Sequence, residues 1–446
     1  MSQHRYLPHT QADIDAMLST CGAATLDDLY SDVPEQLRLK RPYELPEAMS
    51  EKELCDYFER LNARNRKLTC FAGGGYYDHY TPAVVSSILS RSEFLTAYTP
   101  YQPEISQGTL QYIFEYQSMM CELTGMDISN ASMYDGATAT AEAMIMAVNS
   151  ARKKRRVLIS ATVNPAVAEV VSTYARYHGI TLEVIPENEG ISDRYEFEAM
   201  LGAGDVAGVI VAYPNYYGIV EPLEGWADAC HAAKALFIVN CQASTLGVLR
   251  SPASLGADIV CGDAQSLGMP LNFGGPYLGF LCTTKALMRK LPGRIVGATT
   301  DRSGQRVFVL TLQAREQHIR REKATSNICS NQGLMALHTA VYLSLMGAEG
   351  LRRVNDLGYG GIRSLAAKLE ATGRMRLKYP EMPFVNEAVF RTADPLTADR
   401  VIEECAAQGI LAGVKIDESE LLVAVTEMQS PEDIDRYVSI VKNIQL

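Results

Sequence analysis

Residues 258–280 read DIVCGDAQSLGMPLNFGGPYLGF, and this stretch decides the fold class. Two short apolar runs, at 258–262 and 278–284, flank a polar loop that ends in a Gly-Gly-Pro turn. Short, continuous and β-branched runs bounded by glycine and proline are typical of strands in a parallel sheet that is covered on both faces. The stretch therefore predicts two strands of a buried sheet with a loop between them.

Upstream of this stretch, helical and strand-like segments alternate from residue 132 onward. The predicted helices cover 137–155, 165–178, 193–202 and 224–235, and the predicted strands cover 157–160, 181–186, 208–214 and 236–240. Alternating units of this length predict a large, doubly wound α/β domain.

The rest of the chain predicts an arm and a second domain. The first seventy residues have helical apolar spacing that prolines interrupt. A basic loop and a long helix follow over 311–354, and beyond them strands at 384–391 and 420–425 alternate with helices at 397–407 and 431–443. We expect a helical N-terminal arm at 1–70, a large domain at 71–330 and a small C-terminal α/β domain at 331–446.

The composition argues against several functional classes. A net charge of −11 disfavours nucleic acid or an anionic membrane as a partner. The basic run Arg152–Arg156 follows a predicted helix, whose carboxyl end attracts cations. No apolar run approaches the roughly 18 residues of a membrane span, and no secretory signal is visible. The ten cysteines form no CxxC pair, so we expect a cytoplasmic protein without disulfides or a metal site.

Polar residues gather at two places where doubly wound sheets bind ligands. At a helix start, Ser132, Gly136, Thr138 and Thr140 present backbone N–H groups and hydroxyls to a phosphate, or else Asp135 and Thr138 simply cap the helix. Asn240 ends the strand 236–240, as a site residue or as an ordinary polar strand end. The residues themselves leave both alternatives open at each place.

Two loops are rich in polar aromatic side chains. One is GGGYYDHY, residues 73–80, and the other is the proline-stiffened segment 96–108. The second loop presents Tyr98, Tyr101, Gln102, Glu104, Ser106 and Gln107. Such loops are typical either of binding sites or of subunit contacts. A basic cluster at 315–323 binds an anion or forms ordinary ion pairs; its members are Arg315, His318, Arg320, Arg321 and Lys323.

Segments 71–111, 132–143, 262–280 and 310–332 together resemble the glycine decarboxylase P-protein. More narrowly, they resemble its amino-terminal half, which many bacteria make as a separate subunit 1. The resemblance implies a pyridoxal phosphate (PLP)-dependent transferase fold of type I, with a large doubly wound domain and a smaller C-terminal α/β domain. It also implies the first step of the glycine cleavage system: glycine loses carbon dioxide with PLP, and its aminomethyl group passes to the lipoyl arm of the H-protein.

A lysine is missing from the stretch that carries it in this fold. The corresponding residue is Gln265, and the only lysine between residues 160 and 284 is Lys234, at the end of a predicted helix. Asn240 stands where an aspartate usually pairs with the pyridine nitrogen. The resemblance therefore implies that the PLP lysine belongs to a second subunit. The expected relics of a cofactor site are Asp135, Gly136, Thr138, Asn240 and Gln265.

The resemblance implies an obligate partnership and no catalytic residue on this chain alone. The expected partners are the PLP-bearing subunit 2, the lipoylated H-protein and the substrate glycine, as one pair of subunits or as a heterotetramer. The expected contribution in trans comes from Tyr98, Tyr101, Gln102, Glu104, Ser106 and Gln107. An independent PLP enzyme is disfavoured because it needs a lysine that the chain does not offer. A non-catalytic paralogue that scaffolds a partner complex stays open.

Overall fold

The computed structural model describes residues 6–151, 153–313, 317–324, 326, 328 and 331–445. Its contacts divide the chain into two units, Met1–Arg66 and Lys67–Leu446. The first unit contains the helices α1 (Gln11–Cys21) and α2 (Glu51–Asn62), so the predicted helical character is confirmed. Both helices begin with a capping box, in which the N-cap hydroxyl and an acidic side chain three residues later satisfy the first backbone N–H groups.

The second unit is built on a seven-stranded sheet with the order β2-β10-β9-β8-β7-β3-β4. Its strands are β2 (Ile128–Ser129), β3 (Arg156–Ser160), β4 (Thr181–Ile185), β7 (Val206–Tyr213), β8 (Leu236–Gln242), β9 (Ile259–Asp263) and β10 (Gly279–Thr283). Five of them run parallel, whereas β10 is antiparallel to β9 and β2 is antiparallel to β10. The expectation of a uniformly parallel sheet is thus corrected at this edge, where the chain reverses through the Gly-Gly-Pro turn.

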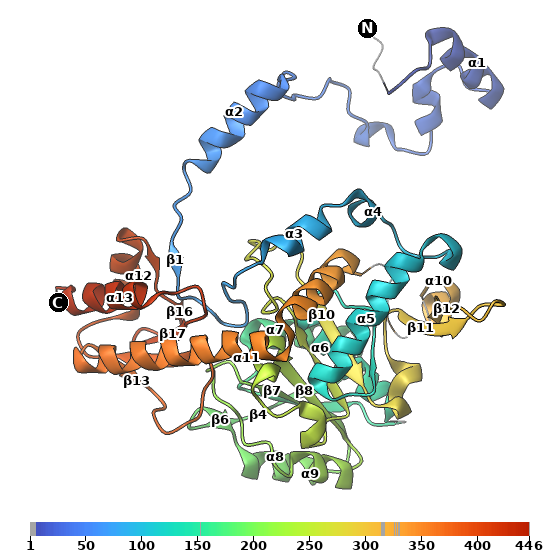
Figure 1. Cartoon of the computed structure of the whole chain (residues 1–446). Coiled ribbons are helices and arrows are strands. Elements are labelled where there is room, and N and C mark those ends of the chain that lie inside the picture. Colours follow the sequence, from blue (N-terminus) through green and yellow to red (C-terminus); the bar gives the residue numbers. More distant parts are fainter. Residues whose placement is uncertain are drawn as a thin grey trace. The chain divides into compact units, whose positions relative to one another are not determined.

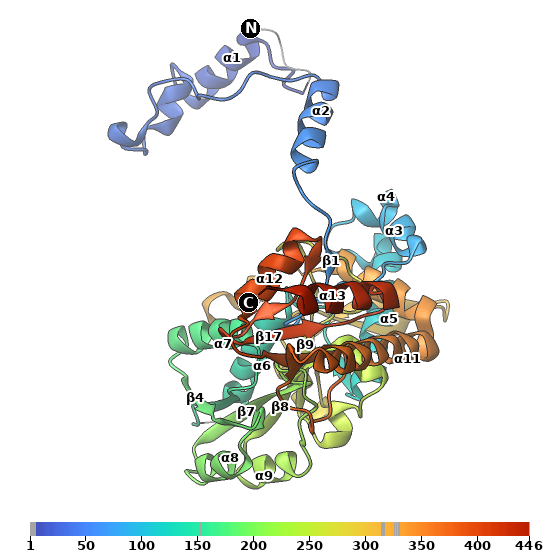
Figure 2. The same cartoon turned by 90° about the vertical axis from the view of Figure 1, so that its left-hand side faces the viewer.

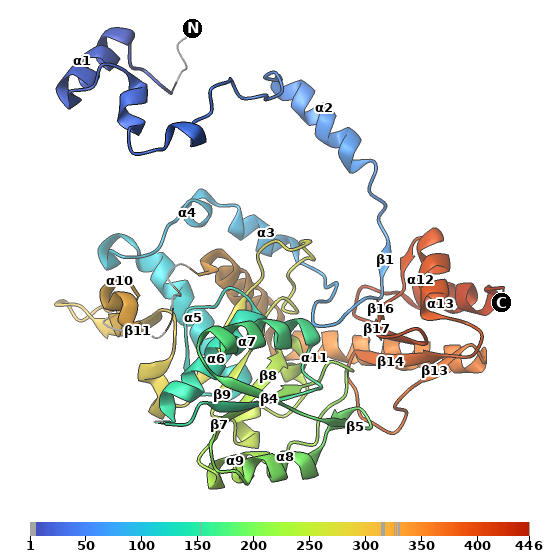
Figure 3. The same cartoon turned by 180° about the vertical axis from the view of Figure 1, so that it is seen from behind.

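Helices cover both faces of this sheet, as the doubly wound prediction requires (Figures 1 and 3). On one face α6 (Gly136–Ser150) and α7 (Pro165–Tyr177) pack on Val157 and Ile159. On the other face Leu158 packs in a core to which several helices contribute. Among these helices are α5 (Gln107–Thr124), α8 (Arg194–Leu201), α9 (Trp226–Ala232) and the first part of α11 (Gly333–Ala371).

The basic run after α6 binds neighbouring elements. Helix α6 ends at Ser150, earlier than predicted. The Lys154 ammonium donates to the Ala233 carbonyl at the end of α9 at 2.7 Å, and the Arg155 guanidinium donates to the Gly179 carbonyl after α7 at 2.9 Å. These cations therefore sit at the carboxyl ends of other helices, where the helix dipole favours them.

A four-stranded antiparallel sheet with the order β13-β14-β17-β16 follows. Its strands are β13 (Met375–Leu377), β14 (Glu387–Thr392), β16 (Val414–Lys415) and β17 (Glu420–Ala424), and it packs with α12 (Ala398–Ala407), α13 (Pro431–Asn443) and the later part of α11 (Figure 2). Helix α11 breaks at Gly347, where φ is 59°. By length and apolar composition alone, α11 is the one described helix that would suffice to cross a membrane; here it packs on both sheets' cores.

The remaining elements are short. They are β1 (Thr69–Cys70), α3 (Ala83–Leu89), α4 (Ser92–Leu95), β5 (Glu187–Asn188), β6 (Ile191–Ser192), β11 (Ile295–Thr300), β12 (Arg306–Thr311), α10 (Gln317–Arg320) and β15 (Ile410–Leu411). Strands β11 and β12 form an antiparallel hairpin that the sequence pattern did not predict. The boundary between a large domain at 71–330 and a small domain at 331–446 stays a prediction.

The stacking of Phe197 on Trp226 offers a test of the core. Both side chains are buried, and their ring centroids lie 3.9 Å apart. We expect Phe197→Ala to lower the free energy of unfolding by about 3–5 kcal/mol, because it leaves a cavity. Tyr195→Ala, on the same helix but 79% exposed, should change it by no more than about 0.5 kcal/mol. Urea unfolding followed by circular dichroism measures both, and equal losses would contradict the packing.

Candidate functional site

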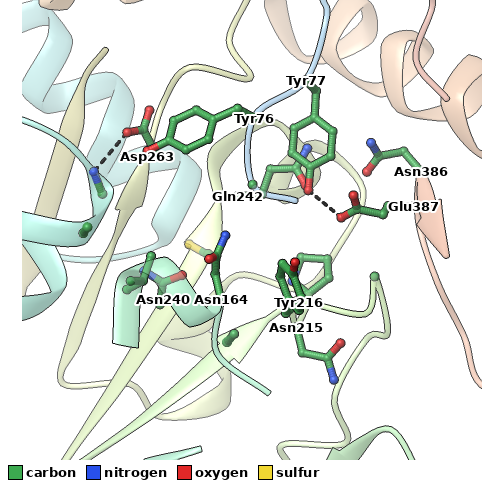
Figure 4. A pocket seen from close by; sticks show the side chains of 18 residues that line it. Tyr76, Tyr77, Asn164, Asn215, Tyr216, Asn240, Gln242, Asp263, Asn386 and Glu387 are labelled. Atoms are coloured by element: carbon green, nitrogen blue, oxygen red, sulfur yellow. Dashed lines mark hydrogen bonds between the residues drawn. The ribbon is translucent and has the colours of Figure 1, made fainter. Parts of the chain in front are cut away.

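A polar cavity lies at the carboxyl ends of β7, β8 and β9 (Figure 4). Its empty space is about 690 Å³, including the solvent at its mouth. The start of α6 and the start of β14 complete the wall, and residues of the segment Gly73–Tyr80 also line it. Ligands bind at this edge in doubly wound sheets, so the fold places the cavity where a site is expected.

Hydrogen bonds hold the Gly73–Tyr80 segment in place from both sides of the cavity. The Gly74 N–H donates to Glu387 Oε1 at 2.6 Å, and Asn164 Nδ2 donates to the Gly74 carbonyl at 2.6 Å. Gly74 has a φ of 75°, which glycine adopts without strain. The sequence alone did not decide whether this segment forms a binding site or a subunit contact. In the structure it is part of the cavity wall.

Gln265 is fully buried, and its carboxamide bonds only to backbone groups. Its Nε2 donates to the carbonyls of Tyr77 and Met269, both at 2.7 Å. Its Oε1 accepts from the Tyr77 N–H at 2.9 Å. A lysine at this position has no acceptor, so it would leave the Tyr77 N–H unpaired in a buried place. Gln265 thus works as a structural clamp.

Asp263 occupies the amino-terminal end of α6. Its Oδ2 accepts from the Gly136 N–H at 3.0 Å, and its Oδ1 accepts from the Gln265 N–H at 2.8 Å. Burial raises the pKa of this carboxyl to about 7, although these hydrogen bonds oppose the shift. Tyr76 lies beside it and stacks on Tyr277 with ring centroids 4.7 Å apart.

Glu387 is the second carboxyl of the cavity wall and comes from β14. It is 3% exposed and accepts from the Gly74 N–H and, at 2.9 Å, from the Tyr77 hydroxyl. Burial raises the pKa of Glu387 to about 7. Burial raises the pKa of the Tyr216 hydroxyl, and the nearby Glu387 carboxylate raises it further.

Two of the five predicted relic residues, Gly136 and Asn240, line this cavity, and the polar groups of all five bond within the chain. Asp135 caps α6 by accepting from the Thr138 N–H at 2.8 Å, and Gly136 bonds to Asp263. Asn240 Nδ2 donates to Thr140 Oγ1 at 2.7 Å. Gln265 clamps Tyr77. The capping alternative therefore accounts for Asp135 and Thr138.

A PLP molecule does not fit this arrangement. Two N–H groups at the start of α6 already bond to carboxylates of the chain, so a phosphate would meet negative charge there. None of the described residues that line the cavity is a lysine, arginine or histidine. The cavity therefore lacks both the covalent anchor and the cations that a phosphate ester requires.

The loop predicted to act in trans lies outside the cavity lining. Its side chains Tyr98 and Tyr101 are 74% and 47% exposed, and Arg294 Nη2 donates to the Tyr101 hydroxyl at 3.2 Å. Gln107 is engaged inside the chain, because its carboxamide bonds to both the N–H and the carbonyl of Phe308 at 2.9 Å. Gln102 and Glu104 are exposed, and Ser106 is half-buried.

The basic cluster at 315–323 falls partly outside the described residues. Arg315 and the side chain of His318 are among those left out. Arg320, Arg321 and Lys323 are exposed at the end of α10 and just after it. The choice between an anion site and an ion-paired face stays open.

Comparisons with known proteins agree over nearly the whole chain. A sequence profile of the glycine cleavage system P-protein matches residues 4–441. The chain belongs to the P-protein family. It is 49% identical to the probable glycine dehydrogenase (decarboxylating) subunit 1 of Geobacillus kaustophilus, over 98% of each chain. A crystal structure of glycine decarboxylase (P-protein) in inhibitor-bound form matches with a TM-score of 0.90 and 42% identity, over 99% of this chain and 100% of the other.

These findings confirm the fold and the assignment to the glycine cleavage P-protein that the resemblance implied. The chain is a subunit of the glycine dehydrogenase (decarboxylating) of the glycine cleavage system, with the type I fold of PLP-dependent transferases. A glutamate decarboxylase of Lactobacillus brevis shares that fold, with a TM-score of 0.69 at 12% identity. PLP is the cofactor of this fold group, and the subunit 1 relatives imply a second subunit.

Sequence reasoning missed several wall residues, above all Asp263, Glu387, Asn386 and Tyr216. A signal existed for Glu387, because this charged residue directly precedes the apolar run Ala388–Phe390 in β14. Asp263 lies two positions before Gln265 in the deciding stretch. No local pattern, however, brings a strand near residue 387 to the glycine segment near residue 74.

Replacing Gln265 by leucine tests its role as a clamp. We expect Gln265→Leu to lower the free energy of unfolding by about 3 kcal/mol or more, because buried backbone groups lose their partners at about 1–3 kcal/mol each. Gln242→Leu is the matched control, since Gln242 lines the same cavity and its side chain bonds only to Ser244 Oγ, at 3.1 Å. Chemical denaturation compares the two variants, and similar stabilities would refute the clamp.

Proposed function

We propose that this chain is the glycine decarboxylase subunit that does not hold the cofactor. The partner subunit carries PLP and its lysine, decarboxylates glycine and passes the aminomethyl group to the lipoyl arm of the H-protein. One observation carries the proposal: Gln265 stands at the lysine position with its carboxamide bonded to backbone groups. PLP supplies the electron sink for decarboxylation, and the cavity of this chain fits no such group. A cytoplasmic location is part of the proposal.

The contribution of this chain to the partner's site comes from the loop Tyr98–Gln107. Tyr98 and Tyr101 are exposed, whereas the loop's base is fixed by the two bonds between Gln107 and Phe308. The Arg294 guanidinium lies 5.3 Å from the Tyr101 ring centroid and bonds to its hydroxyl. A loop that is rigid at its base and exposed at its aromatic tips suits contact with another chain.

The cofactor assignment is tested on each subunit separately. We expect this chain, incubated alone with PLP and reduced with borohydride, to carry no adduct on a cavity residue, because none of the described residues that line its cavity is a lysine. The partner subunit, treated in the same way, should retain PLP. Mass spectrometry of proteolytic peptides locates each adduct. Modification of this chain at a single cavity residue would overturn the assignment.

The loop is tested by glycine–bicarbonate exchange with both subunits and the H-protein present. We expect Tyr101→Ala to lower the exchange rate at least about tenfold, which corresponds to about 1.4 kcal/mol in the transition state. Tyr177→Ala is the control, because Tyr177 is equally aromatic and 79% exposed at the end of α7. The two subunits should still co-elute in both variants. An unchanged rate with Tyr101→Ala would remove the loop from the site, and no gain over the partner alone would favour a scaffold.

A further inference from the structure

The cavity of this chain has the wrong charge for a phosphate and the right charge for an amine. Its described lining residues include the carboxyls Asp263 and Glu387 and no basic side chain. A cavity with acidic walls and no countercharge attracts cations and repels anions. We propose that the cavity binds a small organic amine that also carries an uncharged oxygen, such as an amino alcohol.

Glu387 supplies the charge for the ammonium group. Its carboxylate is almost fully buried and has no ion-pair partner within the described residues. It accepts one hydrogen bond on each oxygen, from Gly74 and from Tyr77, and a carboxylate has room for further donors. An ammonium group at this place would supply the missing countercharge and hold Glu387 ionised.

Aromatic side chains flank the same carboxylate. Tyr77 bonds to it through the hydroxyl, and Tyr216 lies beside it at the cavity wall (Figure 4). Aromatic faces and phenolic oxygens stabilise an ammonium ion that has left water. The titratable groups near Glu387 are these two tyrosines, whose pKa values burial raises, and Asp263 lies at the other end of the cavity. Glu387 is therefore the group that titrates at the amine end.

Asn386 is the residue from which we infer that the ligand carries an oxygen acceptor. Its side chain lines the cavity, the residue is 6% exposed, and its Nδ2 has no hydrogen-bond partner among the residues that the structure describes. Figure 4 shows this amide beside Glu387, directed towards Tyr77. A buried donor without a partner is costly, so an acceptor on a ligand would satisfy it. A carboxylate acceptor would lie next to the Glu387 charge, which favours a hydroxyl or amide oxygen over the carboxylate of an amino acid.

Calorimetric titration of the full chain with ethanolamine tests the proposal. We expect saturable binding at pH 8, binding at least about tenfold weaker for ethylamine, which lacks the oxygen, and weaker binding for glycine. Inorganic phosphate and PLP should not bind in the cavity. Absence of saturable ethanolamine binding, or tighter binding of phosphate, would overturn the proposal.

Matched variants locate the site. Glu387→Gln should weaken ethanolamine binding at least about tenfold, and Asn386→Ala should weaken ethanolamine but not ethylamine. Glu142→Gln is the control, because Glu142 is also buried, burial also raises its pKa to about 7, and it does not line the cavity. Equal losses in the Glu387 and Glu142 variants would refute the site.

The pH dependence of the unmodified chain gives a second measurement that needs no variant. Protonation of Glu387 below its pKa of about 7 removes the charge that the ammonium requires. The amine stays protonated throughout, so ethanolamine affinity should fall about tenfold from pH 8 to pH 6. An affinity that is flat over this range would overturn the proposal. The binding needs no partner subunit, so the result is independent of the proposed function.

Discussion

The carboxamide of Gln265 holds the cavity wall together because it is both a donor and an acceptor. It pairs with the N–H and the carbonyl of Tyr77 and also with the carbonyl of Met269. An ammonium group only donates, so a lysine at this position cannot bind the Gly73–Tyr80 segment in the same way. The fixed backbone of Tyr77 then brings its hydroxyl to Glu387, and Glu387 holds the Gly74 N–H. One residue thus links the loop after β9 to the start of β14.

The exchange of lysine for glutamine is one part of a change in the charge of the whole site. The end of α6, whose N–H groups suit an anion, is occupied by Asp263 and Asp135. Asn240 turns its amide towards Thr140 on α6. Each group that would face a phosphorylated cofactor is therefore bonded within the chain. The ligand edge of the sheet therefore carries acidic side chains at the place where a phosphate would sit.

Local sequence patterns predicted where helices and strands lie better than they predicted the direction of each strand or the contacts between residues far apart in the sequence. The alternation of helices and strands follows from periodicity, and the structure confirms it from α6 to β9. The antiparallel direction of β10 was not predictable, because an apolar run is the same in both directions. In the site, Gln265 and Asn240 were found because each stands in a strand-end or loop motif. Glu387 was not, because its contacts with Gly74 and Tyr77 join residues more than three hundred positions apart.

The two surfaces to which we propose functions, the cavity and the loop Tyr98–Gln107, differ in how the chain orders them. The cavity is lined by groups that the chain itself orders, so any ligand there must match a fixed and acidic wall. The loop Tyr98–Gln107 is fixed at its base by the two hydrogen bonds between Gln107 and Phe308. Its side chains Tyr98 and Ile105 are 74% and 82% exposed. Exposed apolar side chains on an anchored loop lose little entropy when another chain covers them. The proposed action of the loop on a partner subunit is therefore independent of the cavity, because the loop and the cavity depend on different residues.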